Sequence, residues 1–239
     1  MGSRANPAFA GGVVAIAVLA VGYIVSGEAS VQTHTYVHVM AGLLWTGTDL
    51  FMGAVLGPVT GGLEDEESAA LFTRLTPKTT FFLPAMALIT ITGGITLAQR
   101  LGYFPNSEPW LALFTAANLI PALLLAGWRL KVFDDRRWQG LFALSAVGSL
   151  AWVATTVGDL GSISTVVALS LGIVTLLSVQ GFGFLLPGEL RMYQEMTSAE
   201  PDASIIARIG SRNAMLGGVQ GLLQLVLIWL MVSLRWGGL

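Results

Sequence analysis

Long uncharged stretches alternate with short charged ones along the whole sequence. The apolar stretches are continuous and do not alternate apolar with polar residues. A helix needs about 20 consecutive apolar residues to cross a bilayer, and continuous runs distinguish such helices from the strands of a membrane barrel. The pattern therefore predicts an all-α, polytopic membrane helix bundle. We expect the chain to form a single transmembrane domain with seven helices, at residues 9–26, 35–58, 79–99, 109–128, 138–158, 162–187 and 213–235.

Composition supports a membrane location and excludes several classes of protein. Hydrophobic residues make up 54% of the 239 residues and charged residues only 11%, whereas a soluble domain carries about 25% charge. The absence of Cys excludes disulfides, thiolate metal sites and a cysteine nucleophile. The net charge of −2 leaves no basic surface for nucleic acid. The lipid bilayer is therefore the expected partner, and no sequence motif assigns an enzymatic activity.

The basic residues predict how the chain is oriented in the membrane. The N-terminal tail and the expected loops 59–78, 129–137 and 188–212 hold all Lys and Arg residues except Arg100 and Arg235. Because loops rich in Lys and Arg remain in the cytoplasm, we expect a cytoplasmic N-terminus and an outer C-terminus in a prokaryotic cell membrane. The first helix is expected to be retained. The loops 59–78 and 188–212 are each expected to contain a short amphipathic helix, the second around Glu189–Met196.

The second predicted helix carries most of the polar residues that bear on function. At about 100° per residue, four of its side chains share one face, with both histidines at the outer boundary and Asp49 about 16 Å deeper: His34, His38, Trp45 and Asp49. An ionisable side chain inside a bilayer normally faces the bundle interior. Asp49 is therefore a candidate proton or ion relay, or alternatively a hydrogen-bonding group that ties helices together.

Glutamines on other predicted helices lie at a depth similar to that of Asp49, namely Gln180, Gln220 and Gln224. Their amides can donate hydrogen bonds to a carboxyl group and accept them from it, and Gln220 and Gln224 are the expected neighbours. No Lys or Arg is predicted at that depth. We therefore expect Asp49 to be protonated at neutral pH unless a transported cation or a water-filled cavity reaches it.

The two histidines offer a different chemistry. Their spacing, i and i+4, allows His34 and His38 to chelate one metal ion from a single helix face. Asp159, in a predicted outer turn, could join them as an oxygen ligand. A haem would instead need one histidine with a ligand from another helix, or a five-coordinate iron. The alternative is that both histidines form hydrogen bonds at the level of the lipid headgroups.

A family resemblance bears on these histidines. The pattern His38-x6-Trp45-x-Gly47-x3-Phe51, closing at Pro58, resembles the first helix of the copper-resistance D-type membrane proteins and their haem-b-binding or uncharacterised relatives. The similarity covers about residues 34–160 and implies a four-helix core there. It implies haem b or copper as the cofactor and His38 as its ligand. The shared helix face adds His34 and Trp45 as candidate cofactor-binding residues. The sequence departs from the family pattern because no later helix carries a histidine.

The sequence is therefore compatible with three functions. The first is binding of b-type haem or a metal ion near the outer face, for redox chemistry or metal handling. The second is a proton- or cation-coupled transporter or channel that uses Asp49. The third is an accessory subunit of a membrane complex, and a homo-oligomer is compatible with all three.

Overall fold

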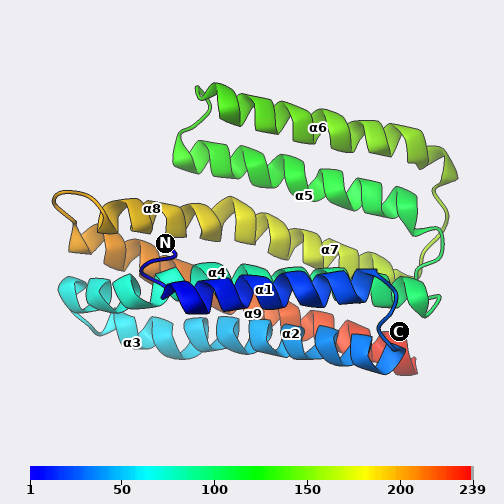
Figure 1. Ribbon diagram of the computed structural model, residues 1–239, viewed down its shortest axis with the longest axis horizontal. Coiled ribbons are helices and arrows are strands. Elements are labelled where there is room, and N and C mark those ends of the chain that lie inside the picture. The colour runs from blue at the N-terminus through cyan, green and yellow to red at the C-terminus, as the bar shows by residue number, and fades with distance from the viewer. Residues whose placement is uncertain (238–239) are drawn as a thin grey trace. The chain divides into compact units, whose positions relative to one another are not determined.

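The structure is a computed structural model that describes residues 1–237, and every regular element in that range is a helix (Figure 1). Seven helical segments are long and apolar enough to cross a membrane. The all-α bundle of seven membrane helices is therefore confirmed, and the chain is a multi-pass membrane protein. The segments are Pro7–Val25, Val31–Thr60, Asp65–Arg100, Ser107–Leu130, Arg136–Asp159, Thr165–Met196 and Ala203–Trp236.

Several of these segments combine more than one helical element. Two of them contain a π-helical stretch: η1 in the second and η3 in the sixth. The elements in chain order are α1 (Pro7–Val25), α2 (Val31–Phe51), η1 (Met52–Leu56), α3 (Gly57–Gly61), α4 (Asp65–Arg100), α5 (Ser107–Leu130), α6 (Arg136–Thr156), η2 (Val157–Asp159), α7 (Thr165–Gln180), η3 (Gly181–Leu185), α8 (Leu186–Met196) and α9 (Ala203–Trp236).

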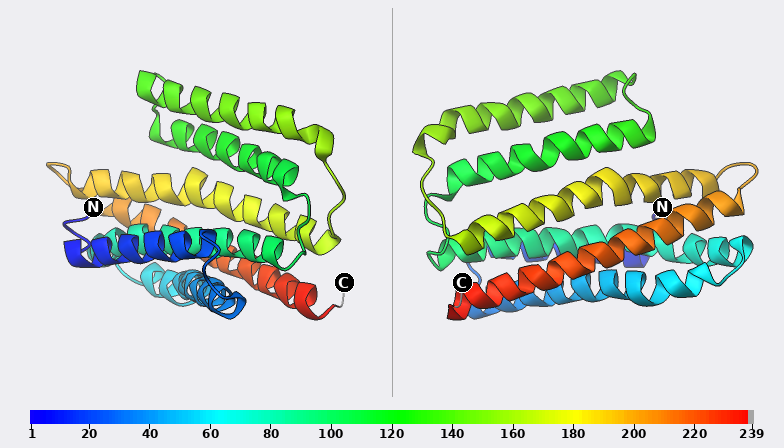
Figure 2. Two further views of the ribbon diagram at one scale, coloured as in Figure 1. Left: turned by 45° about the vertical axis from the view of Figure 1, so that its right-hand side comes forward. Right: turned by 180° about the vertical axis from the view of Figure 1, so that it is seen from behind.

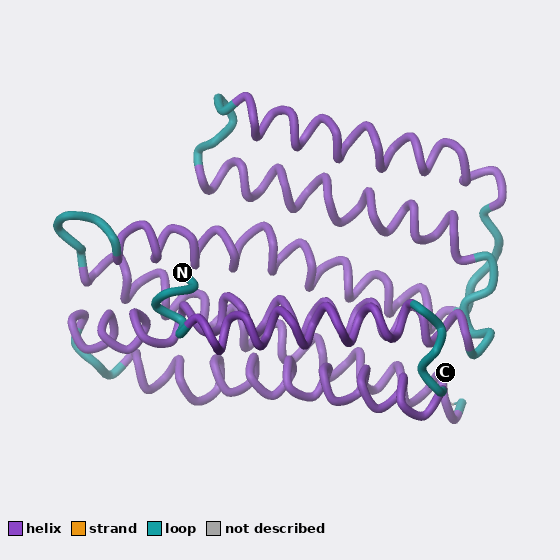
Figure 3. The backbone as a smooth tube through the Cα atoms, viewed as in Figure 1, coloured by secondary structure: helices purple, strands orange, loops and turns teal. Residues whose placement is uncertain are grey.

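The helices are longer, and the loops shorter, than the sequence predicted (Figure 3). The expected loop 59–78 is wrong from Asp65 onward, because α4 begins there. The expected loop 188–212 shrinks to residues 197–202. The helix predicted around Glu189–Met196 is present as α8, but it continues directly from η3 instead of standing alone. Charged residues that suggested loops thus lie on helix ends, where long side chains reach the membrane surface or water.

Short polar side chains set the starting points of the helices. Asn6 accepts a hydrogen bond from the Ala8 amide at 3.0 Å, and Ser30 accepts one from the Thr33 amide at 3.1 Å. These bonds satisfy amide groups that have no partner within the first turn of a helix. The same arrangement begins α6, α7 and α9, at Asp135, Ser164 and Asp202.

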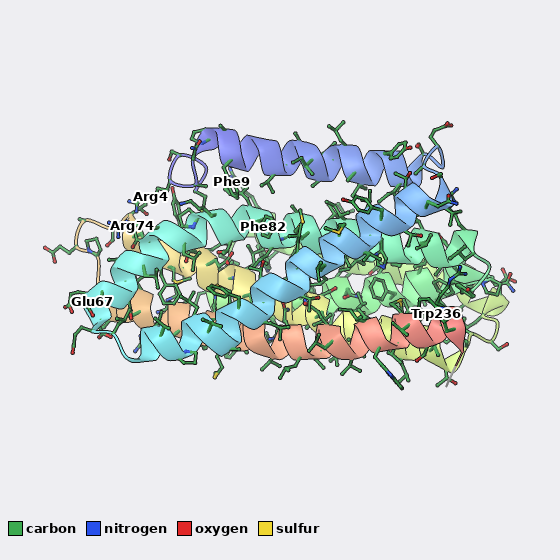
Figure 4. The ribbon with its side chains drawn as sticks, turned by 90° about the horizontal axis from the view of Figure 1, so that it is seen from below. Arg4, Phe9, Glu67, Arg74, Phe82 and Trp236 are labelled. Atoms are coloured by element: carbon green, nitrogen blue, oxygen red, sulfur yellow. The ribbon has the colours of Figure 1, made fainter. Side chains whose placement is uncertain are left out.

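The chain divides into two compact units. Unit 1 comprises Met1–Arg100 and Gly188–Leu225, and unit 2 comprises Leu101–Pro187 and Val226–Leu239. In unit 1, both α1 and α2 pack against α4. Arg4, Glu67 and Arg74 lie at the same end of this unit (Figure 4). The predicted core 34–160 crosses the boundary at residue 100, so it stays a prediction.

The first part of α9 packs closely on the other helices of unit 1 through glycines. A Cβ atom added to Gly218 would lie 2.8 Å from the Cα atom of Gly53, so the two backbones are in direct contact. Gly210 faces the Phe72 ring in the same way. Phe72 belongs to a buried cluster that joins α4, α8 and α9, formed by Ala69, Phe72, Met192, Met196, Ile206 and Ile209.

Unit 2 is built around α5, which packs against α6 on one side and against α7 and η3 on another. Helices α5 and α6 form an antiparallel hairpin (Figure 2). The Trp110 indole donates a hydrogen bond to the Gly161 carbonyl at 2.9 Å. Small side chains line the buried positions of α5, which lets neighbouring helices approach closely. These are Ala112, Ala116, Ala122 and Ala126.

Candidate functional site

Asp49 is the central residue of a buried polar site in unit 1. Helix α2 places it in the interior, where its side chain is 1% exposed. The Gln224 amide on α9 donates a hydrogen bond from Nε2 to Asp49 Oδ2 at 2.9 Å. The Trp45 indole, one turn earlier on α2, also contributes hydrogen bonding to this carboxyl group. The structure thus brings together Asp49 and Gln224, as the sequence predicted.

The two glutamines of α9 belong to unit 1, and both are buried. Gln220 is 2% exposed and Gln224 is 3% exposed. The Oε1 atom of Gln224 is buried and has no hydrogen-bond partner within the described part of the chain. Gln180, the third glutamine predicted for this site, lies on α7 in unit 2. Gln220 and Gln224 thus belong to the same unit as Asp49.

Glu189 adds a second carboxyl group that the sequence analysis missed. It lies on α8, is half-buried and interacts electrostatically with Asp49. The Thr79 hydroxyl on α4 donates a hydrogen bond to its Oε1 atom at 3.5 Å, and Thr80 contributes another. Because charged residues bounded the predicted membrane helices, the sequence placed Glu189 in the loop 188–212, within a short amphipathic helix. Continuation of the helix through Pro187 and Gly188 brings Glu189 into the bundle.

Each carboxyl group lies close to a π-helical stretch. Asp49 precedes η1 (Met52–Leu56) by three residues, and Glu189 follows η3 (Gly181–Leu185) by four. A π-helical turn has one extra residue, which rotates the side chains beyond it and interrupts the regular hydrogen-bond ladder. Such turns occur often at functional sites. The two helical segments that carry Asp49 and Glu189 thus share the same local irregularity.

The basic residues of unit 1 differ from Asp49 in burial. Every Lys and Arg side chain of the unit is exposed, whereas Asp49 is buried. Arg100, for example, donates hydrogen bonds to the Ala29 carbonyl and to His34. No fixed cation of unit 1 therefore neutralises Asp49. The exposed basic residues are Arg4, Arg74, Lys78, Arg100, Arg191, Arg208 and Arg212.

His34 is fully occupied by hydrogen bonds. Its side chain has 0% exposure. Its Nδ1 atom lies 3.3 Å from an Arg100 nitrogen, which can only donate, so Nδ1 accepts. The Nε2 atom then carries the hydrogen and donates to the Gly93 carbonyl at 3.0 Å, with the Thr96 hydroxyl 3.1 Å away. Neither ring nitrogen is left for a metal, so His34 joins α2 to α4.

His38 differs from His34 in this respect. Its Nδ1 atom lies 2.9 Å from the Thr90 carbonyl, which can only accept, so Nδ1 carries the hydrogen and Nε2 has a free lone pair. The ring packs against Gly94, where an added Cβ atom would come within 2.9 Å of it. A histidine held through Nδ1 in this way presents Nε2 as a possible ligand. Residues 1–237 contain no group of three or more His, Asp or Glu side chains placed to hold a metal ion, and Asp159 lies in unit 2.

A polar cavity of about 410 Å³ opens at one end of unit 1. Ser68, at its edge, donates a hydrogen bond to the Thr60 carbonyl at 3.1 Å. Thr60 ends the membrane segment that carries Asp49, eleven residues further along the same helical run. The cavity gives water access to that end of the helices. Polar residues line most of it, including Thr60, Asp65, Ser68, Ser204, Arg208 and Ser211.

Comparison of the chain with family models, with curated proteins and with solved structures gave no match. The function of the protein is therefore inferred from the residues of the site.

Proposed function

We propose that this membrane protein transfers protons across the bilayer through unit 1, with Asp49 and Glu189 as the carrying groups. The observation that supports this function is the pair of interacting carboxyl groups on α2 and α8, in a unit whose Lys and Arg side chains are all exposed. In a low-dielectric interior, the charge of one carboxyl group acts on the proton affinity of the other. Ionisable residues inside membrane helices commonly mark such proton paths.

The surrounding groups suit proton transfer because they can both donate and accept hydrogen bonds. The Gln224 amide contacts Asp49, and the Thr79 hydroxyl contacts Glu189. On one side, the polar cavity at Thr60 and Ser68 lets water approach. On the other side, His38 lies about 16 Å along α2 from Asp49, so transfer over that distance requires intervening water.

Proton flux into vesicles tests this function. Purified protein in liposomes, in sodium chloride buffer with a pH-sensitive dye inside, should dissipate an imposed pH gradient. Asp49→Asn keeps the shape of the side chain but cannot carry a proton, so its flux should fall to that of protein-free vesicles. Glu189→Gln should lower the flux as well. Glu67→Gln, which removes an exposed carboxylate from the same unit, should leave the flux unchanged.

Two results would contradict the proposal. Wild-type flux from a folded Asp49→Asn protein would leave Asp49 with the role of tying helices together. Absence of flux from the folded wild-type protein would favour the accessory-subunit alternative, in which the chain acts only within an oligomer or a larger membrane complex.

The orientation of the chain is part of the same proposal. The unequal distribution of Lys and Arg supports a cytoplasmic N-terminus in the cell membrane. Ser198 and Ser162 are exposed, in the α8–α9 loop and just before α7 respectively. Because the chain has no Cys, single cysteines at these positions can be labelled selectively. An impermeant thiol reagent added to intact cells should label Ser162→Cys and spare Ser198→Cys, and the reverse pattern would overturn the orientation.

Haem or metal binding at His38 is the second candidate function, supported by the free Nε2 atom and by the resemblance of residues 34–160 to copper-resistance D-type proteins. The residues fit one ligand bond, because His34 has no free nitrogen. A bound haem would supply electron transfer, and His38 would orient it. Purified protein should then show a Soret band or bound copper that His38→Ala removes and His34→Ala retains. A colourless, metal-free protein would exclude this candidate.

A further inference from the structure

We infer that Asp49 and Gln224 form a binding site for a small alkali-metal cation of the size of Na⁺, which exchanges with the proton on Asp49. The inference rests on the proposed function and adds a coupling ion to it. It begins from the Gln224 amide, which is 3% exposed. Nε2 of this amide donates to Asp49 Oδ2 at 2.9 Å, while Oε1 is buried and has no partner in the described chain.

A carboxyl group alone cannot satisfy this amide. In the observed orientation Nε2 is paired and Oε1 is not. If the amide were turned over, a protonated Asp49 could donate to Oε1, but the Nε2 hydrogens would then lose their acceptor. A cation beside Asp49 satisfies the observed orientation, because it binds the carboxylate and Oε1 while Nε2 keeps its hydrogen bond.

A glycine on α9 leaves the space beside the same carboxyl group free of a side chain. A Cβ atom added to Gly217 would lie 3.6 Å from Asp49 Oδ1, 3.8 Å from the Asp49 main-chain oxygen and 3.8 Å from the Met52 Cβ atom. At these contact distances, a larger residue at position 217 would press against two oxygens of Asp49. Gly217 lies two turns before Gln224 on α9, so the same helix supplies the amide and the position without a side chain.

The chemistry of the ligands selects the class of ion. Carboxylate, amide and main-chain oxygens are hard ligands that bind alkali and alkaline-earth cations, whereas transition metals prefer nitrogen and sulfur. Asp49 places a carboxylate beside Gln224, and its one negative charge matches a single positive charge. Glu189, from α8, is the other ionisable group that interacts with Asp49, and its own hydrogen-bond partners are the Thr79 and Thr80 hydroxyls on α4.

The exchange is balanced in charge and atoms. Na⁺ enters as the O–H bond of a protonated Asp49 breaks, and that proton leaves to water. One positive charge replaces another, so the charge of the buried site does not change. The site would thus couple the movement of protons to that of the cation in the opposite direction.

Thermal unfolding in detergent tests the site directly. Sodium chloride replaces choline chloride at constant ionic strength and pH, and the midpoint Tm is recorded. Because an ion that binds only the folded protein raises its stability, Tm of the wild type should rise with Na⁺ and then saturate. Asp49→Asn should abolish the rise. Gln224→Met and Gly217→Ala should shift it to concentrations about 10- to 100-fold higher.

Matched variants control for stability and for buried amides in general. Gly47→Ala changes a glycine of α2 with nothing within 4 Å of its Cβ position. Asn118→Leu removes a half-buried amide from unit 2, whose buried Oδ1 atom also has no hydrogen-bond partner among the described residues. Both variants should keep the wild-type response to Na⁺. If Gly217→Ala fails to fold, proton release from the wild-type protein tests the cation site instead. Sodium chloride is added to a weakly buffered sample, and about one proton per chain should be released because Na⁺ replaces the proton on Asp49.

The result that overturns the inference is a Tm that does not respond to Na⁺, or a response that Asp49→Asn leaves intact. Vesicle flux separates this failure from failure of the proposed function. Proton flux that depends on Asp49 but is the same in choline chloride and in sodium chloride would keep the proton path and reject the cation site. Absence of proton flux in both salts would reject both.

Discussion

The two units of the chain differ in what they bury. Unit 1 contains a buried aspartate, a buried histidine and two buried glutamines, whereas the buried polar side chains of unit 2 are two serines. Both units consist of membrane helices of similar composition. Burial of polar groups away from water is unfavourable unless they find partners, so the accumulation in unit 1 indicates a function that uses them. The set in unit 1 is His34, Thr46, Asp49, Thr60, Ser68, Thr76, Thr79, Gln220 and Gln224, and that in unit 2 is Ser149 and Ser233.

Unit 2 shows how these helices pack without such groups. Alanines on α5 allow close contact, and a few hydrogen bonds such as that of Trp110 connect loops and helices. Within unit 2, the Asn118 side-chain amide donates a hydrogen bond from Nδ2 to the Phe114 carbonyl of its own helix at 2.6 Å. Unit 2 is therefore a reference for packing alone, against which changes in unit 1 can be measured.

The largest expected difference between the units concerns two phenylalanines. Phe72 in unit 1 is 1% exposed within the cluster that joins α4, α8 and α9, whereas Phe182 in unit 2 is 49% exposed. Phe72→Ala should lower the free energy of unfolding by about 3–5 kcal/mol, because it leaves a cavity. Phe182→Ala should change it by about 0.5 kcal/mol or less. Unfolding of each variant in denaturant measures both, and equal effects would contradict the assignment of the core.

Two glycines give the next largest difference. Gly53→Ala in unit 1 would push a methyl group into the backbone of α9 at Gly218, and should destabilise the protein by about 1–3 kcal/mol. Gly172→Ala in unit 2 meets nothing within 4 Å and should be neutral or slightly stabilising, since Ala favours the helix. Thermal unfolding of the two variants in the same detergent makes the comparison. A neutral Gly53→Ala would show that η1 and α9 are not in contact at this point.

A smaller effect is expected from the amide of unit 2. The Oδ1 atom of Asn118 is buried without a partner, so the side chain gains little from its position. Asn118→Leu should therefore change the unfolding free energy by about 1 kcal/mol or less, in either direction. Proton flux should stay at the wild-type level. A large loss of flux would extend the proton path into unit 2 and break the distinction between the units.

The smallest effect concerns the start of α9 at Asp202, outside the membrane segments. The hydrogen bond from the Ser204 hydroxyl, followed by that from the Ile205 amide, lowers the pKa of this exposed carboxyl. Its charged form thus adds stability above the ordinary Asp pKa of 3.8, and this contribution is lost as the pH falls through the lower, folded-state value. Asp202→Asn should remove this part of the acid dependence of Tm. If Tm of Asp202→Asn depends on acid pH in the same way as Tm of the wild type, the hydrogen bonds to Asp202 do not contribute to stability.

The sequence was sufficient to predict the helices and part of the site. Apolar runs located every membrane segment, because the bilayer imposes a minimum length. Helical periodicity placed Asp49 on an inward face, and equal depth suggested Gln224 as its partner, which the hydrogen bond of 2.9 Å bears out. These features follow from local periodicity, and local periodicity is visible in a sequence.

Other features depend on contacts between distant residues and were not predictable in this way. The sixth predicted helix ended at residue 187, but the helix continues through Pro187 and Gly188 and brings Glu189 within electrostatic reach of Asp49. His34 was a candidate ligand by its spacing from His38. Its Nδ1 contact with Arg100 and its Nε2 bond to Gly93 depend on how α2 packs on α4. Spacing within one helix carries no information about either partner.

The length of α4 means that one helix is stabilised by two different solvents. Its 36 residues span about 54 Å, well beyond the roughly 30 Å of hydrocarbon in a bilayer. The turns around Phe72 precede the apolar stretch, so water drives the association of that end with α8 and α9. Further along, lipid tails compete equally well for apolar side chains, and close backbone fit and polar contacts hold the helices together. Lipid composition should therefore tune the interior around Asp49, while aqueous cosolvents should act first on the end around Phe72.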